Sequence, residues 1–132
     1  MREKHLDAKN AKSILEAAEK QMKYTLTLVP TEESAFNIVR NIYECFRMVG
    51  EALLISKGIQ SQDHIEPIIE ITNLNINTSR PIRVVDNLRR MRNDINYRGY
   101  SARKIEAEDA ISLAKSCFYQ LLSKAKGEID SN

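Results

Sequence analysis

The hydrophobic residues of this chain recur at three- and four-residue steps from near its start to near its end. Such steps place apolar side chains on one face of an α-helix, whereas a half-buried strand alternates apolar and polar residues in twos. No segment sustains that alternation, so the sequence predicts no strands. The steps predict helices over residues 7–28, 32–56, 65–73, 81–98 and 106–126.

Residues that start and stop helices support these boundaries. Pro30 is expected to stop the first helix, and Thr31 to cap the second with its side-chain oxygen. Pro81 is expected to open the fourth helix, and Gly58 and Gly99 to end the second and fourth in the left-handed conformation. Short links between several long helices predict one domain over residues 1–132 with an all-α fold, an up-and-down bundle of four to five helices.

The composition suits a packed helical domain, with 42% hydrophobic and 29% charged residues. Cys45 and Cys117 lack the spacing of a metal or redox motif, and each falls on an apolar stripe, so we interpret both as core residues. No apolar run approaches the roughly 18 residues of a membrane span, and the charged start is unlike a secretory signal. We therefore expect a cytoplasmic protein that makes no membrane contact.

The net charge of the chain is only +2, so binding to nucleic acid has to depend on local charge. Between residues 80 and 104, eight basic residues stand against two acidic ones. The densest part is RRMRNDINYRGY, residues 89–100. Guanidinium groups suit phosphate oxygens through paired hydrogen bonds, and Tyr97 and Tyr100 offer aromatic faces on which a base can stack.

A helical projection of residues 82–97 separates three faces of this segment. One face is solvated, with pairs of opposite sign expected at Asp86–Arg90 and Arg90–Asp94. The opposite face is an apolar strip expected in the core, made of Val84, Leu88, Met91 and Ile95.

The flank between those two faces has no carboxylate from this helix in the projection, and it carries Arg89, Arg92, Asn93 and Asn96. An arginine beside a core boundary needs a counter-charge, because desolvating an unpaired charge is costly. Either an acid of another helix supplies it, such as Glu44 or Glu51, or an anionic ligand does.

The segment LRRMRNDINYRG resembles the signature region of HEPN domains, a family named for nucleotide binding in higher eukaryotes and prokaryotes. Three other parts of the chain occur in the order of that family's helices: NIYECFRMVGEALLISKGI, SQDHIEPIIEI and AEDAISLAKSCFYQLL. The resemblance therefore covers about residues 10–126. It implies a homodimer that binds RNA or a nucleotide, or that pairs with a minimal nucleotidyltransferase, as in toxin–antitoxin systems. No cofactor is expected, because the sequence shows no metal-ligand cluster and no glycine-rich phosphate loop.

The family's ribonucleases share an arginine, a polar neighbour and a histidine a few positions later, and they cleave RNA without metal. Arg92 and Asn93 match the first two, but the histidine place falls on Tyr97, Arg98 or Gly99. A phenol of ordinary pKa is a poor base at neutral pH, so the resemblance favours a degenerate site over an active one. The two histidines of the chain, His5 and His64, are interpreted as surface residues.

Three hypotheses follow from these residues. The first is a dimeric binding module whose ligand contacts come from Arg89, Arg92, Asn93, Asn96, Tyr97 and Tyr100. The second is a metal-independent ribonuclease in which Arg92 stabilises charge and Tyr97 or another group handles the proton. The third is a purely structural assembly domain in which an acid of a neighbouring helix neutralises Arg92.

Overall fold

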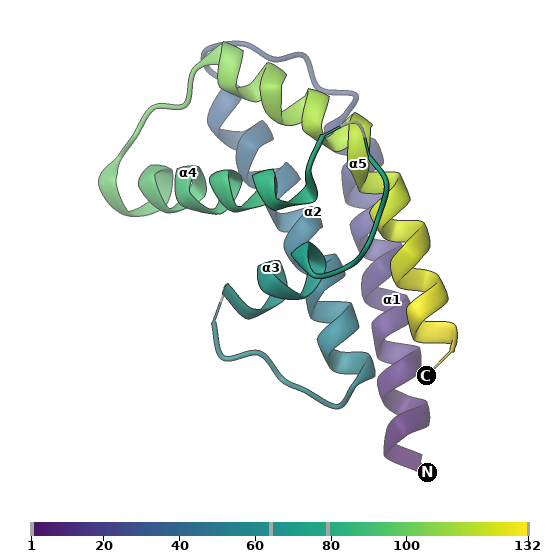
Figure 1. Cartoon of the computed structure of the whole chain (residues 1–132). Helices are drawn as coiled ribbons and strands as arrows, with labels where there is room; N and C mark the ends of the chain where they lie inside the picture. The colour runs from purple at the N-terminus through teal and green to yellow at the C-terminus, as the bar shows by residue number, and fades with distance from the viewer. Residues whose placement is uncertain (1, 64, 79, 132) are drawn as a thin grey trace.

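The computed structural model describes residues 2–63, 65–78 and 80–131, with side chains from residue 7 onward (Figure 1). The described part contains five α-helices, one short 3-10 turn and no strand, which confirms the all-α bundle. The elements, in chain order, are α1 Arg2–Thr25, α2 Ala35–Ser56, α3 Ile65–Thr72, η1 Ile82–Val84, α4 Val85–Arg98 and α5 Lys104–Asp130.

Helix α2 is the centre of the bundle, because α1, α3, α4 and α5 all pack against it. Helices α1 and α5 lie alongside it and run in opposite directions, as the ion pairs Lys12–Asp130 at 3.1 Å and Lys126–Glu19 at 3.4 Å require. Helix α4 lies across α2, and its C-terminal end extends away from the three long helices (Figure 1). Residues 96–100, at this end of α4, are all exposed.

The core lies where α2 meets α1 and α5. The rings of Phe46 and Phe118 meet edge to face there, with 5.3 Å between their centres. Cys45 and Cys117 are buried in the same core, as expected, and both are free thiols. Burial raises the pKa of Cys45 to about 12 and that of Cys117 to about 11, so both thiols are neutral at physiological pH.

The apolar strip of α4 is only partly covered, contrary to the expectation that it is a core strip along its length. Leu88 is buried, whereas Met91 and Ile95 are half-buried at the edge of the core. Val85, and not the expected Val84, takes the buried place at the start of the helix. The cause is the 3-10 turn that follows Pro81: it delays the α-helix to Val85 and changes which side chain faces inward.

Several expected boundaries are wrong by a few residues. Helix α1 ends at Thr25, and residues 26–28 form turns held by backbone hydrogen bonds such as Thr27 N–H to Tyr24 O at 3.0 Å. Thr31 caps a turn, and not a helix: its Oγ1 accepts from the backbone N–H of Ser34 at 2.9 Å, and α2 begins at Ala35. Helix α5 begins earlier and ends later than expected, from Lys104 to Asp130.

The glycines at helix ends behave as predicted, since Gly58 has φ 78° and Gly99 has φ 65°. Gly50 lies inside α2, and the sequence did not indicate why a glycine is needed there. A Cβ at Gly50 would lie 2.1 Å from the carbonyl oxygen of Pro67, so only glycine lets α3 approach α2 this closely. Gly50 thus fixes the position of α3 on the bundle.

Candidate functional site

Arg92 of α4 is half-buried and lies near two aromatic rings, one from α2 and one from its own helix. Its guanidinium carbon is 5.9 Å from the centre of the Tyr43 ring of α2 and 5.9 Å from that of Tyr97 of α4. Both separations suit attraction between a cation and an aromatic face. Arg92 Nη1 also donates a hydrogen bond to Asn93 Oδ1 at 3.1 Å. The two ring contacts and this hydrogen bond together orient the guanidinium.

Glu44 and Glu51, the acids expected as partners of Arg92, are both bound by Arg47 of the same helix. Arg47 Nε donates to Glu44 Oε2 at 3.0 Å, and Arg47 Nη1 donates to Glu51 Oε1 at 2.9 Å. These hydrogen bonds and charges raise the pKa of Arg47, so it stays a cation. The proposed neutralisation of Arg92 by either acid is therefore wrong, because one turn of α2 already supplies their cation.

The expectation of a flank without carboxylates is wrong for Arg89. Its Nε donates to Asp86 Oδ1 at 2.8 Å, and Arg90 meets the other oxygen of Asp86 at 3.3 Å. Residues three and four apart are neighbours on a helix, so one carboxylate reaches both arginines. The pair expected between Arg90 and Asp94 is replaced by a contact of Asp94 with Arg98, at 3.8 Å.

Arg92 differs from these neighbours, because no carboxylate of the described residues lies within ion-pair distance of it. Only one of its five N–H groups donates to a described side-chain oxygen, that of Asn93. A half-buried guanidinium in this setting keeps several donors for an oxygen-rich anion.

Tyr43 is the residue of this site that the sequence analysis missed as a functional candidate. Its side chain is fully buried, and burial raises the pKa of its phenol to about 12, although the nearby charges of Arg92, Arg47 and Arg89 act in the opposite direction. The phenol is neutral at physiological pH. Its ring is held in the core, and one side of it contacts the Arg92 guanidinium. The helix periodicity shows only that Tyr43 faces inward; the crossing of α4 over α2 decides what it meets.

The remaining candidates divide into two groups. Asn93 and Tyr97 contact Arg92, and Asn96 is exposed on the same side of the helix, four residues after Arg92. Tyr100 instead turns toward α5, where its hydroxyl donates to Glu106 Oε1 at 2.7 Å. That hydrogen bond raises the pKa of Tyr100.

The remaining expectations concern a metal site, the two histidines and a membrane-spanning helix. In the part of the chain that the structure describes, no group of three or more histidine, cysteine or acidic side chains is placed to hold a metal ion. His64 and the side chain of His5, expected at the surface, lie outside the described residues. Within the described residues, none of the helices combines the length and apolarity needed to cross a bilayer.

Comparison with known proteins gives no relative: no family model, no curated protein and no solved structure matches this chain. The resemblance to HEPN domains therefore rests on the residues of the chain itself.

Proposed function

We propose that this chain is a HEPN-like binding module, dimeric and without catalysis, which binds RNA or a nucleotide through a phosphate at Arg92. Arg92, Asn93, Asn96 and Tyr97 form the binding face, which we call the Arg92 face. Phosphate oxygens accept the free guanidinium N–H groups, and a nucleic-acid base stacks on Tyr97, whose side chain is 75% exposed.

The observation that supports this proposal is the difference between Arg92 and the arginines around it. Arg47 and Arg89 have carboxylates within hydrogen-bond distance, whereas Arg92 has two rings and an amide. Rings and an amide hold a guanidinium in place without neutralising its charge. A positioned, uncompensated cation at a half-buried place favours an anion from outside the chain.

We propose a dimer because the end of α4 leaves apolar side chains partly exposed, and a second copy could cover them. Met91 and Ile95 are half-buried, and a hollow of about 230 Å³ lies beside Ile95, with Phe36 and Tyr100 also in its lining. A second copy that packs on this end brings two Arg92 faces close together. A minimal nucleotidyltransferase, the partner implied by the HEPN resemblance, is the alternative protein for the same surface.

A ribonuclease is the second candidate, favoured by the 5.9 Å that separates Arg92 from the ring of Tyr97. Arg92 would stabilise the charge that develops on the nonbridging phosphate oxygens, and Tyr97 or another group would move the proton from the attacking hydroxyl to the leaving oxygen. Mixed RNA incubated with purified protein and EDTA separates this candidate from the first. Cleavage that Arg92→Ala abolishes supports the ribonuclease; intact RNA, or equal cleavage by the variant, rejects it.

The binding proposal is tested by titrating a labelled single-stranded RNA at several salt concentrations with three proteins: wild type, Arg92→Gln and Arg98→Gln. Arg98 is a matched control, because it is on the same helix, loses the same charge and is already paired with Asp94. Losing one phosphate contact reduces the salt slope by about 0.7, and we expect this only for Arg92→Gln. Equal losses for both variants, or affinity independent of salt, would contradict the proposal.

A further inference from the structure

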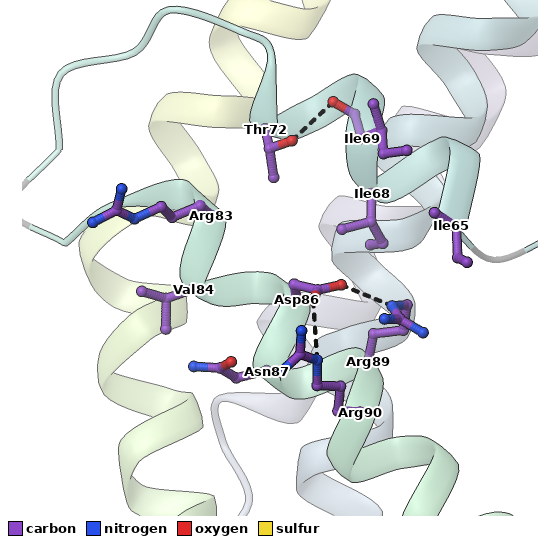
Figure 2. A pocket seen from close by; sticks show the side chains of 10 residues that line it. All are labelled: Ile65, Ile68, Ile69, Thr72, Arg83, Val84, Asp86, Asn87, Arg89 and Arg90. Carbon is purple, nitrogen blue, oxygen red and sulfur yellow. Dashed lines mark hydrogen bonds and ion pairs between the residues drawn. The ribbon is translucent and has the colours of Figure 1, made fainter.

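A groove of about 580 Å³ lies between α3 and the start of α4 (Figure 2). Its volume is in the range of specific binding pockets. None of the Arg92-face residues lines it. The groove has two chemically different walls, and only Arg89 of the second wall was among the ligand contacts expected from the sequence.

The α3 wall is mainly aliphatic: Ile65, Ile68 and Ile69 line it together with Thr72. Ile65 and Ile69 are 47% and 50% exposed, whereas the other two isoleucines of this eight-residue helix, Ile68 and Ile71, are buried. Neighbouring β-branched side chains left in water on one face indicate a surface that gains free energy when a partner covers it.

The opposite wall, formed by η1 and the start of α4, is basic, with three arginines and one aspartate among its residues. Figure 2 shows Asp86 between Arg89 and Arg90, hydrogen-bonded or ion-paired to both, and Arg83 apart from them. No carboxylate of the described residues lies within ion-pair distance of Arg83. One acid among three cations leaves this wall with an excess of positive charge.

Both walls are held in place by the core. Gly50 and Pro67 fix α3 on α2 by their close approach, and Ile71 of α3 is buried. Val85 and Leu88 anchor the start of α4. A groove with fixed walls loses little conformational entropy on binding, which favours affinity.

We propose that this groove binds a short segment of a partner protein in which aliphatic side chains are interleaved with carboxylates. The aliphatic groups cover Ile65 and Ile69, and the carboxylates pair with Arg83 and Arg90. RNA fits this surface less well: none of the ten lining residues offers an aromatic ring to a base, and Asp86 repels phosphate. The groove shares no lining residue with the Arg92 face, although Arg89 lies one helical turn before Arg92, and we assign it a different partner.

Selection from a displayed library of short random peptides on the full-length chain tests the proposal. We expect enrichment of peptides that combine Leu, Ile or Val with Asp or Glu, and a synthetic copy of an enriched peptide then serves as the probe. Replacing its acids by amides, or its aliphatic residues by serine, should each weaken binding by about tenfold or more.

Two variants of the chain locate the probe in the groove. Ile69→Glu inserts a charge into the aliphatic wall, and Arg83→Glu reverses the uncompensated cation; each should weaken binding of the probe by about tenfold. Their controls are Ile105→Glu, at a side chain of α5 that is 65% exposed, and Lys115→Glu, also exposed on α5. Unchanged thermal unfolding confirms that each variant is folded, as expected at exposed positions.

Three results would overturn this inference. The first is a library that yields no acidic and aliphatic peptides. The second is a probe whose affinity falls equally in the groove variants and in their controls. The third is RNA that competes with the probe and loses affinity in Ile69→Glu and Arg83→Glu, which would assign the groove to nucleic acid.

Discussion

The guanidinium carbon of Arg92 on α4 lies 5.9 Å from the centre of the buried Tyr43 ring on α2. This contact joins the two helices at their crossing and explains how a cation is kept at the edge of a core without a carboxylate. The ring supplies attraction without neutralising the charge. Arg92 is therefore both a packing residue and the candidate anion-binding residue of this chain.

Replacing Tyr43 tests whether its ring positions Arg92. Tyr43→Leu should lower the free energy of unfolding by about 2–4 kcal/mol, because it leaves a cavity in the core and removes the ring beneath the guanidinium. It should also weaken RNA binding. Tyr43→Phe keeps the ring and should cost only about 1 kcal/mol, with RNA binding retained. Urea unfolding and RNA titration measure the two effects; equal RNA affinity of all three proteins would argue against a positioning role for the ring.

Gly50 should be intolerant of even one methyl group. In Gly50→Ala the new Cβ would lie 2.1 Å from Pro67 O, so α3 has to shift, and we expect a loss of about 1–3 kcal/mol in the free energy of unfolding. Gly127→Ala is the control, because a Cβ at Gly127 meets nothing within 4 Å on α5. That variant should gain about 0.5–1 kcal/mol from helix propensity. Denaturant unfolding of both compares them directly, and a Gly50→Ala protein as stable as wild type would refute the close approach.

Alkaline pH should destabilise the fold partly through Cys45. Burial raises the pKa of this thiol from 9.0 to about 12, so the unfolded chain releases the proton at a lower pH than the folded protein does. Above about pH 9 the unfolded state binds fewer protons, and the free energy of unfolding falls as pH rises; below that pH both states keep the proton.

Cys45→Ala isolates this contribution. From about pH 8 to about pH 10, wild type should lose about 1 kcal/mol more stability than the variant, since the titration of lysines and other groups is common to both. Urea unfolding at several pH values gives the comparison. Parallel curves for the two proteins would show that the thiol does not titrate as its burial requires.

The exposed end of α4 predicts dimerisation. Sedimentation velocity should give a dimer for wild type and a monomer for Ile95→Lys, because the lysine places a charge in the apolar contact. Ile105→Lys, at an exposed position of α5, should remain dimeric. A wild type that stays monomeric at every concentration, or variants that do not differ, would remove the dimer from the proposal.

The helices could be predicted from the sequence because burial is periodic along them. Leu88 and Phe118 repeat with their neighbours at helical steps, and Gly99 marks a helix end that requires positive φ. Two boundary errors come from local turns: Thr31 and Ser34 build one ahead of α2, and the 3-10 turn after Pro81 delays α4. A repeat of three and four residues carries no information about such turns.

The candidate site could be predicted only within α4, where Arg92, Asn93 and Tyr97 are neighbours on one helix. The projection missed the Asp86–Arg89 pair, because long side chains bend across the boundaries between faces. It also missed Tyr43 and the groove, since both depend on how α4 crosses α2 and where α3 lies. Those placements are tertiary, and no local pattern encodes them.

The most direct test of the account follows the guanidinium nitrogens by nuclear magnetic resonance while a short RNA is added. If Arg92 receives the phosphate, its Nε resonance should shift with RNA concentration. The Nε resonance of Arg47, which is bound to Glu44 and Glu51, should not move. A fixed Arg92 resonance, while exposed arginines such as Arg40 respond to the RNA, would contradict the claim that Arg92 receives the anion.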